Sequence, residues 1–278
     1  MSLVKMKEIL IKAEEENYGV GAFSVANMEM VMGAIRAAEE LRSPIILQIA
    51  EVRLSHSPLH LIGPMMIAAA KEANVPVAVH FDHGETVGKI REALKLGFTS
   101  VMFDGSSLPI EQNIQETKRI VSLASTYGAT VEGEIGRVGG SEDGSVDIEI
   151  AITSVKDAKR FAEETEIDAL AVAIGNAHGE YKGKPNLRFA RLKEIYETTN
   201  IPLVLHGGSG IEEAEFREAI QKGIRKINVA TSTFNRVLKT INEQVPFNYY
   251  FSYHERVVQA SHENVSKHIK MFQSEGRI

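Results

Sequence analysis

The segment PLVLHGGSGIEEAEFREAIQKGIRKINVAT, residues 202–231, contains the pattern that decides the fold. An apolar run at Pro202–Gly208 leads through a glycine-rich turn to an amphipathic stretch at Glu212–Gln221, and a second apolar run follows at Lys226–Thr231. These runs are apolar throughout instead of alternating, which is typical of parallel strands buried on both faces. A strand, a helix and a second strand in this order predict a right-handed βαβ unit.

The same alternation extends along the whole chain. Eight such units in 278 residues favour a (β/α)₈ TIM barrel, with an open doubly wound sheet as the alternative. The predicted strands are Gly19–Val25, Pro44–Ala50, Pro76–Asp82, Ser100–Asp104, Thr130–Gly136, Ala169–Ile174, Pro202–Gly208 and Lys226–Thr231. The predicted helices between them are Met28–Leu41, Leu59–Ala73, Val87–Leu96, Ile110–Tyr127, Val155–Glu164, Phe189–Thr198 and Glu212–Gln221.

No proline- or serine-rich linker divides the chain, so a single barrel domain over residues 1–278 is expected. A first helix at Lys5–Glu16 is expected to cap the barrel base, and helix spacing returns in a C-terminal helical tail at Phe247–Ile278. The aromatic stretch that opens this tail either contacts a partner subunit or packs on the surface. The glycine-rich, acidic segment Arg137–Ala151 is long for a loop in a compact domain, which favours an active-site lid.

Composition excludes several classes of protein. The chain is 44% hydrophobic and 24% charged, which is ordinary globular composition and excludes a fibrous or wholly disordered protein. The net charge of −6, without a basic stripe, argues against nucleic-acid binding. No apolar run approaches the ~20 residues that cross a bilayer, and the amino terminus does not resemble a secretory signal, so we expect a cytoplasmic protein without a membrane partner. Since cysteine is absent, histidines and carboxylates are the expected ligands for any transition metal.

Three of the nine histidines follow predicted strands at the carboxyl-terminal end of the barrel, where the active sites of this fold lie. They are His83, His178 and His206. A single histidine is more often a hydrogen-bonded polar side chain than a ligand. Three at converging strand ends favour a catalytic Zn²⁺ site with one open position.

The loops after the seventh and eighth predicted strands are typical of a phosphate site. Gly207, Gly208 and Ser209 form a turn before a helix, where backbone N–H groups and the helix terminus attract an anion. The neighbouring segment Asn228–Thr231 adds an amide and a hydroxyl at the position where barrels often bind phosphate. Alternatively, the glycines only connect a strand to a helix.

Four carboxylates lie on the same rim or in its loops. Asp82 directly precedes His83 and is placed to reach a metal-bound substrate, or else to orient a histidine. Glu142 lies in the predicted lid, where it enters the site or remains a solvated loop charge. Asp104 and Glu134 end the fourth and fifth strands, and either support the histidines or form an auxiliary metal site.

Several motifs in order resemble one family nearly from end to end. They are His80-Phe-Asp-His83-Gly, Val101-Met-Phe-Asp-Gly-Ser-Ser, Val131-Glu-Gly-Glu-Ile-Gly136 with Gly139-Gly-Ser-Glu-Asp-Gly144, Ala173-Ile-Gly-Asn-Ala-His178-Gly, the His206 loop and Lys226-Ile-Asn-Val-Ala-Thr231. With these motifs the chain resembles the class II, zinc-dependent ketose-bisphosphate aldolases, which include fructose- and tagatose-bisphosphate aldolases.

The resemblance implies reversible aldol cleavage of a ketose (bis)phosphate to dihydroxyacetone phosphate and an aldehyde, with fructose or tagatose bisphosphate as the default substrate. Zn²⁺ on His83, His178 and His206 would act as a Lewis acid and stabilise the enediolate. Asp82 would take the proton of the C4 hydroxyl, and Glu142 would protonate the enediolate carbon. The resemblance also implies a monovalent cation, Na⁺ or K⁺, beside the phosphate and assembly as a homodimer or homotetramer. The residues implied for dihydroxyacetone phosphate are Gly179, Gly207, Gly208, Ser209, Asn228, Val229, Ala230 and Thr231.

The sequence departs from the family on the aldehyde side of the substrate. Tyr249-Tyr250-Phe251 replaces an Asp-Pro-Arg stretch whose arginine binds the distal phosphate, Ala50 replaces a serine, and Ser24 replaces an asparagine. These changes predict an aldehyde half that differs from glyceraldehyde 3-phosphate, either unphosphorylated or carrying another group such as a carboxylate. A charge for a second phosphate remains available from Arg53, Arg256 or His254.

Two other classes of protein remain alternatives. A zinc hydrolase explains the histidines but not the glycine loop together with Asn228. A non-catalytic barrel that binds a sugar phosphate does not need the carboxylates Asp82 and Glu142. A Schiff-base aldolase is disfavoured, because Lys226 is the one lysine near a strand end and is expected to open its strand at the wrong end of the barrel.

Overall fold

The computed structural model describes every residue except 1, 141–148, 180–182, 184 and 244. Eight parallel strands form a closed barrel in chain order, because β8 pairs with β1 as well as with β7. The closed barrel confirms the predicted (β/α)₈ fold and excludes the open sheet. The strands are β1 Val20–Ser24, β2 Ile45–Ala50, β3 Val77–Gly84, β4 Ser100–Phe103, β5 Thr130–Ile135, β6 Ala169–Val172, β7 Leu203–Leu205 and β8 Ile224–Val229.

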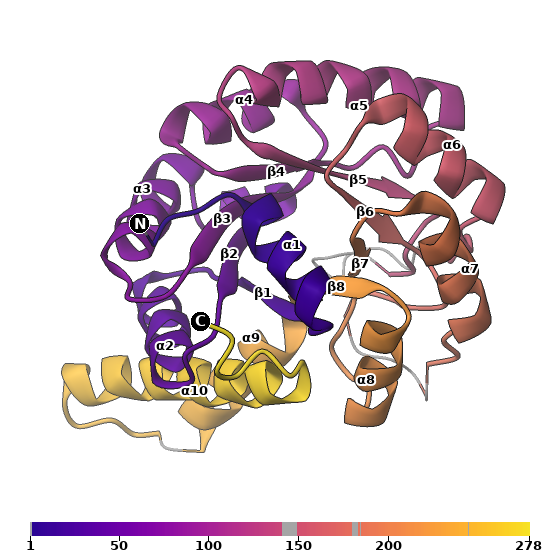
Figure 1. Ribbon diagram of the computed structural model, residues 1–278. Helices are drawn as coiled ribbons and strands as arrows, with labels where there is room; N and C mark the ends of the chain where they lie inside the picture. Colours follow the sequence, from indigo (N-terminus) through magenta and orange to yellow (C-terminus); the bar gives the residue numbers. More distant parts are fainter. Residues whose placement is uncertain (1, 141–148, 180–182, 184, 244) are drawn as a thin grey trace.

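The helices surround the strands as an outer ring, except for the first one, which lies across the barrel (Figure 1). They are α1 Met6–Glu16, α2 Met28–Glu40, the 3₁₀ helix η1 Glu51–Ser55, α3 Leu59–Glu72, α4 Val87–Leu96, α5 Ile110–Ser125, α6 Val155–Thr165, α7 Phe189–Thr199, α8 Glu213–Gln221, α9 Thr231–Asn242 and α10 Tyr250–Met271. In the described part of the chain, none of them has the length and apolarity that a membrane span requires.

Among the α-helices of the described residues, α9 is the one that the sequence pattern does not predict. It begins at Thr231, directly after β8, where the sequence predicts the last residue of a strand. Its first turn contains two threonines and a serine, which have modest helix propensity, and no turn residue separates it from the strand. The helix therefore starts at the rim of the barrel, and its amino-terminal end lies beside the loop that follows β7.

Helix α1 crosses the base of the barrel, as predicted for Lys5–Glu16 (Figure 1). Its apolar face packs onto small and branched side chains that point inward from the strands. Burying one such side chain stabilises the fold by about 1.5–3 kcal/mol. The apolar base of the barrel consists of Met6, Ile9, Leu10, Ala13, Tyr18, Val20, Ala22, Ile46, Ala78, Ala169, Ala171 and Val204.

Helix α10 confirms the predicted helical tail and packs along α2 (Figure 1). The two helices approach so closely that a Cβ atom on Gly33 would lie 2.5 Å from the carbonyl oxygen of Val258, so only glycine fits there. Among the aromatic residues at the start of the tail, Tyr253 packs against the apolar core, and three others are exposed. Tyr249, Tyr250 and Phe251 are 62%, 65% and 54% exposed, so surface packing and a partner contact both stay open for this stretch.

Candidate active site

The three histidines predicted from the strand ends lie together at the carboxyl-terminal end of the barrel. His83 is the penultimate residue of β3, His178 follows β6 and His206 follows β7. One ring nitrogen from each lies within 4.8 Å of the other two, and Nδ1 of His206 is 2.8 Å from Nε2 of His83. Imidazole nitrogens that converge in this way are the donor set of three-histidine zinc sites.

Carboxylates orient two of these rings from the opposite side. Asp104 Oδ2 lies 2.7 Å from His83 Nδ1, and Glu132 Oε1 lies 2.8 Å from His206 Nε2. In each ring the other nitrogen therefore faces the cluster. A carboxylate behind a histidine is the arrangement that fixes ring orientation in metal sites. By the chemistry of these donors, the residues present fit a divalent transition metal.

Glu134, predicted as a partner of Asp104, is buried beside the same cluster. Its Oε2 lies 3.9 Å from His206 Nδ1, and the ligand atoms of His83, Asp104 and Glu134 lie within 4.8 Å of one another. Burial and the neighbouring Asp104 carboxylate raise the pKa of Glu134 well above its ordinary value. The arrangement permits both predicted functions of this pair, which are support of the histidines and an auxiliary metal site.

A β-bulge brings Asp82 and His83 to the same site. Side chains of adjacent strand residues normally point to opposite faces of a sheet. Here the register between β3 and β4 shifts between Phe81 and Gly84, and His83 adopts a positive φ of 43°. A non-glycine residue in this left-handed region costs about 1–2 kcal/mol. The bulge turns His83 inward, beside the carboxylate of Asp82.

Asp82 is fully buried and held by donors from β2, which neighbours its own strand, and from β8, which does not. It accepts a hydrogen bond from Gln48 Nε2 at 3.0 Å, and Asn228 Nδ2 lies 3.2 Å from both of its oxygens. Burial alone would raise the pKa of Asp82, but the charge of His83, the nearby His80 ring with Nε2 3.6 Å from Oδ1, and the charge of Lys226 hold it well below its ordinary value. Asp82 is therefore an ionised carboxylate next to the histidine cluster, as a proton acceptor requires.

The barrel interior contains further charged residues that the sequence interpretation missed. Lys226 was expected at the wrong end of its strand, and this is wrong: β8 begins at Ile224, and the Lys226 side chain is fully buried with Nζ 4.0 Å from Asp82 Oδ1. Glu132 and His80 are fully buried too, and Nδ1 of His80 lies 2.7 Å from Ser100 Oγ. The period of two in strands gives the missed signal, because Glu132 precedes Glu134, and His80 precedes Asp82, by two residues.

Electrostatics keep this interior cluster in defined charge states. The Lys226 ammonium and the contact with His206 lower the pKa of Glu132 to about 2, although burial by itself raises it. Burial and the adjacent His83 lower the pKa of His206 to about 4, so its ring is neutral near pH 7. A neutral imidazole is the form that binds a metal.

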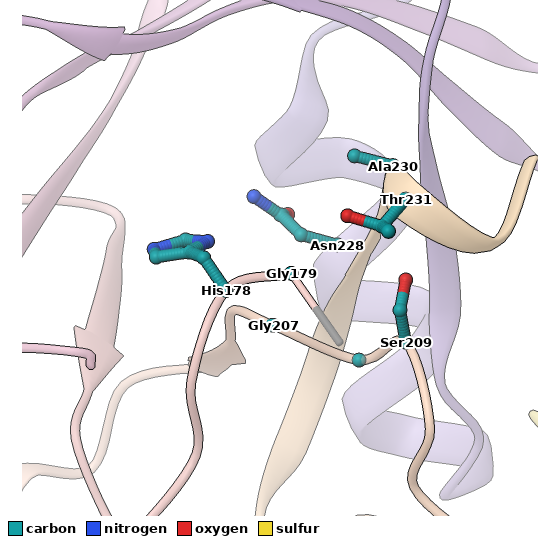
Figure 2. Close-up of a pocket in the computed structure, with 8 residues that line it drawn as sticks. His178, Gly179, Gly207, Ser209, Asn228, Ala230 and Thr231 are labelled. Carbon is teal, nitrogen blue, oxygen red and sulfur yellow. The ribbon is translucent and has the colours of Figure 1, made fainter. Parts of the chain in front are cut away.

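A pocket opens between the loops after β6, β7 and β8 (Figure 2). In Figure 2 the side chains of Asn228, Thr231 and Ser209 lie on one side of it, and His178 lies on the other. Ser209 Oγ accepts a hydrogen bond at 2.9 Å from the backbone N–H of Ser232, in the first turn of α9. The pocket is lined by His178, Gly179, Gly207, Gly208, Ser209, Asn228, Ala230 and Thr231.

This lining contains seven of the eight residues that the resemblance implies for dihydroxyacetone phosphate. The exception is Val229, whose side chain is buried in the apolar core between strands and helices. Gly207 must be glycine, since it has a positive φ of 66° and a Cβ there would lie 2.1 Å from the carbonyl oxygen of Ala177. Backbone groups and the α9 terminus around this pocket suit an anion.

The predicted lid is attached next to His178. Arg137 and Ala151 exchange two backbone hydrogen bonds of 2.8 and 2.9 Å, and His178 donates its backbone N–H to the carbonyl oxygen of Gly139 at 2.7 Å. The start of the segment is therefore tied to the loop that carries a cluster histidine. Glu142, the predicted proton donor, lies outside the described residues.

The adjoining part of the rim, at β1 and β2, carries two of the three departures from the family pattern. Ala50 is the register partner of Asp82, and Ser24 Oγ lies 3.2 Å from Gln48 Nε2. Three residues after Ala50, the Arg53 guanidinium lies over the ring of Phe234, 5.3 Å from its centroid, and so bridges the rim to the second turn of α9. His254 instead pairs with Glu29 at 3.0 Å, and Arg256 lies exposed on α10.

Comparisons with known proteins agree with this geometry. The family model "Fructose-bisphosphate aldolase class-II" matches residues 4–277. The chain is 40% identical to a sulfofructosephosphate aldolase of Alkalicoccus urumqiensis over 283 aligned residues, covering 100% of this chain and 99% of that one. It is 43% identical to a fructose-bisphosphate aldolase of Staphylococcus aureus over 234 residues, covering 83% and 82%. The crystal structure of the YdjI aldolase of Escherichia coli K12 superposes with a TM-score of 0.90 at 33% identity, covering 99% of both chains.

Proposed function

The chain belongs to the class II fructose-bisphosphate aldolase family, and from this premise we propose that it reversibly cleaves a ketose 1-phosphate whose aldehyde half carries a distal anion, a phosphate or a sulfonate. As a member of this family it is an aldolase, a carbon–carbon lyase acting on small sugar phosphates. The aldolase assignment therefore replaces the two alternative classes, a zinc hydrolase and a non-catalytic barrel that binds a sugar phosphate. The observation that carries the detailed proposal is the buried Asp82 carboxylate, beside His83 and bonded by Asn228 of the pocket.

We assign Zn²⁺ to His83, His178 and His206. Family members are generally metal dependent, and these three rings converge with carboxylates behind two of them. A bound Zn²⁺ supplies Lewis acidity that stabilises negative charge developing on the ketone oxygen of the substrate. Asp104 and Glu132 maintain the ring orientation that such a site needs.

The pocket between the β6, β7 and β8 loops is assigned to the phosphate of dihydroxyacetone phosphate. Gly179, Gly207 and Gly208 leave backbone groups accessible to the anion, and Ser209 and Thr231 supply hydroxyls. The backbone of Val229 and Ala230 completes the wall. A monovalent cation, Na⁺ or K⁺, is proposed to balance the charge of the phosphate.

Proton transfers are assigned to two carboxylates. In the cleavage direction Asp82 accepts the proton of the C4 hydroxyl, the C3–C4 bond breaks, and the aldehyde forms at C4. The bonding electron pair remains on C3 of the dihydroxyacetone phosphate half. Glu142 then donates a proton to C3, while the lid keeps water from the carbanion.

The distal end of the substrate is assigned to the rim formed by β1 and β2. Arg53 supplies the cation there, because it lies beside the strand end that carries Asp82, and its planar guanidinium matches the oxygens of a phosphate or sulfonate. The sulfofructosephosphate aldolase relative, matched over the full chain, supports the sulfonate form. The fructose-bisphosphate aldolase relative supports the phosphate form.

The test of the half-reaction is hydrogen–deuterium exchange at the hydroxymethyl carbon of dihydroxyacetone phosphate, followed by NMR. We expect exchange with the zinc-loaded protein and none with the chelator-stripped protein. The exchange rate is measured with and without an unreactive aldehyde analogue. The sample with the analogue covers the case in which the lid closes only when the aldehyde site is filled. No exchange from a verified zinc-loaded sample under either condition would contradict the assigned mechanism.

The test of the distal end compares ketose 1-phosphates that differ only there, with a phosphate, a sulfonate, a carboxylate or a hydroxyl. For the preferred anionic substrate we expect Arg53→Met to lower kcat/KM by roughly 10–100-fold, the loss of one charge-assisted contact. Exchange on dihydroxyacetone phosphate is expected to stay unchanged. Equal cleavage of all four compounds by the wild type would overturn the distal-anion assignment.

We further propose a single-domain cytoplasmic enzyme, residues 1–278, that assembles as a homodimer or homotetramer. The exposed Tyr249, Tyr250 and Phe251 supply an aromatic surface suited to a subunit contact. Light scattering on the intact protein tests the assembly. A Tyr250→Glu variant is expected to shift the distribution towards the monomer if this surface is the contact.

A further inference from the structure

Lys226 places a cation inside the barrel, below the proposed reaction site. Its side chain is fully buried, as are those of His80, Asp82 and Glu132. Removing an ammonium group from water costs several kcal/mol unless good partners surround it. A lysine in this position therefore needs a function that an apolar side chain of the same volume would not serve.

The contacts of Lys226 define that function. Its Nζ donates a hydrogen bond to Asn228 Oδ1 at 2.7 Å and lies 2.9 Å from Glu132 Oε2. On the other side of the amide, Asn228 Nδ2 lies 3.2 Å from both oxygens of Asp82. An ammonium group only donates and an ionised carboxylate only accepts hydrogen bonds. The amide of Asn228 thus satisfies both neighbours in one orientation alone.

The alternative orientation is repulsive at both ends. Turning the amide by 180° would place its NH₂ group against the ammonium of Lys226 and its oxygen against the carboxylate of Asp82. The terminal torsion of asparagine is otherwise broad and roughly two-fold, so the side chain by itself does not select an orientation. We propose that Lys226 is a positioning residue that locks the Asn228 amide with its N–H donors facing Asp82 and the substrate pocket.

This orientation matters because Asn228 lines the pocket and Lys226 does not. Asn228 Nδ2 also lies 3.4 Å from both ring nitrogens of His206, at the junction of pocket and histidine cluster. A donor fixed before the substrate binds stabilises developing negative charge without reorganisation during the reaction. The inference rests on the proposed function, since it assigns the pocket to dihydroxyacetone phosphate.

The same lysine connects the amide to the histidine cluster. Glu132 directs Oε2 to Lys226 and Oε1 to His206 Nε2, at 2.9 and 2.8 Å. One buried carboxylate thus neutralises the ammonium and orients a histidine ring. The lysine is enclosed by Asn228 and Glu132, which leaves it no access to a substrate carbonyl. Lys226 therefore positions another side chain and does not form a Schiff base.

The experiment is a double-mutant cycle between Lys226→Met and Asn228→Ala, read by kcat, KM and the exchange rate on dihydroxyacetone phosphate. We expect Lys226→Met to lower kcat and exchange roughly 100-fold, the size of losing one preorganised donor, with KM within about threefold. Because Lys226 acts through Asn228, the double variant is expected to be no slower than Asn228→Ala alone. Metal content and thermal unfolding are measured on every variant.

A charge-balanced variant keeps the test decisive if the single lysine substitution does not fold. Lys226→Met with Glu132→Gln removes both charges, and it is compared with Glu132→Gln alone at full metal loading. Two results would overturn the inference. One is a double variant whose loss of kcat equals the product of the two single losses. The other is a metal-loaded Lys226→Met enzyme with kcat within threefold of wild type. Absence of exchange in the wild type would instead reject the proposed function.

Discussion

The base and the top of the barrel interior are built from opposite kinds of side chain. At the base, α1 seals the strands with Met6, Ile9 and Leu10 against alanines and branched residues. At the top, strands β3, β5 and β8 place His80, Asp82, Glu132, Lys226 and Asn228 in a space that is equally closed to solvent. Both halves are buried, but one is apolar and the other is charged.

The difference separates the sources of stability and activity in one barrel. Apolar burial at the base stabilises the fold by about 25 cal/mol per Å² removed from water. Buried ion pairs at the top roughly cancel their desolvation cost or fall short of it. Substitutions at the top are therefore expected to cause a large loss of activity, with a loss of stability where they leave a buried charge unpaired, whereas substitutions at the base are expected to lower stability alone.

The largest expected effect tests the top half. Asp82→Asn removes the proposed proton acceptor and keeps its shape, so we expect kcat to fall roughly 10³-fold. The free energy of unfolding is expected to fall as well, because the new NH₂ group would face the amide donors of Gln48 and Asn228, and Lys226 would lose a nearby negative charge. Steady-state kinetics at verified metal loading and urea unfolding measure the two quantities. A kcat within tenfold of wild type would contradict the assignment of catalytic activity to the top of the barrel.

The second effect tests the base. Leu10→Ala is expected to lower the free energy of unfolding by about 2–5 kcal/mol, because it opens a cavity under the strands. Activity per folded molecule should stay within twofold of wild type. Ile11→Ala on the same helix is the matched control, since Ile11 is 46% exposed, and it should cost far less. A catalytic defect in folded Leu10→Ala protein would show that the two halves are coupled.

A smaller effect sharpens the assignment within the top half. Glu132→Gln removes the carboxylate behind His206, and we expect metal affinity to fall roughly 10–100-fold. Competition with a chelator of known affinity measures this loss. Glu163→Gln, on the exposed face of α6, serves as the control. An unchanged metal affinity would mean that Glu132 pairs with Lys226 but does not support the metal-binding orientation of His206.

The smallest effect concerns a buried titratable group outside the barrel. Burial lowers the pKa of His268 in α10 to about 4, against 6.5 for an ordinary histidine. Between pH 6.5 and 4 the unfolded chain therefore binds a proton that the folded chain does not, so stability falls as the pH falls. We expect a loss of about 2 kcal/mol between pH 6.5 and 4.5 that is absent in His268→Gln. Parallel pH profiles of the two unfolding curves would contradict this.

The sequence predicted what depends on strand order and strand ends. Apolar runs alternating with amphipathic segments were enough for the barrel, and the position of His83, His178 and His206 after their strands was enough for the cluster. The pocket at the β7 and β8 loops followed from the glycine turn. These features are local in sequence, because each is read from one strand and the residues after it.

The parts that could not be predicted depend on contacts between strands far apart in the chain. Lys226 meets Glu132 across the barrel, and nothing local to either residue indicates the pairing. Helix α9 forms despite weak propensity, because its start is set by the end of β8. The inward turn of His83 depends on the register between β3 and β4, which the residues of β3 alone do not specify.

That bulge has a consequence for anyone who transplants this chemistry to another scaffold. On a regular strand, an Asp-His pair copied at adjacent positions would send one side chain to the helix layer and lose half of the site. The graft must include one irregular residue in the host strand and a neighbouring strand that accepts the shifted register. The host also needs about 1–2 kcal/mol of stability in reserve for the left-handed histidine. The transferable unit is therefore a strand with its defect, and not a list of side chains.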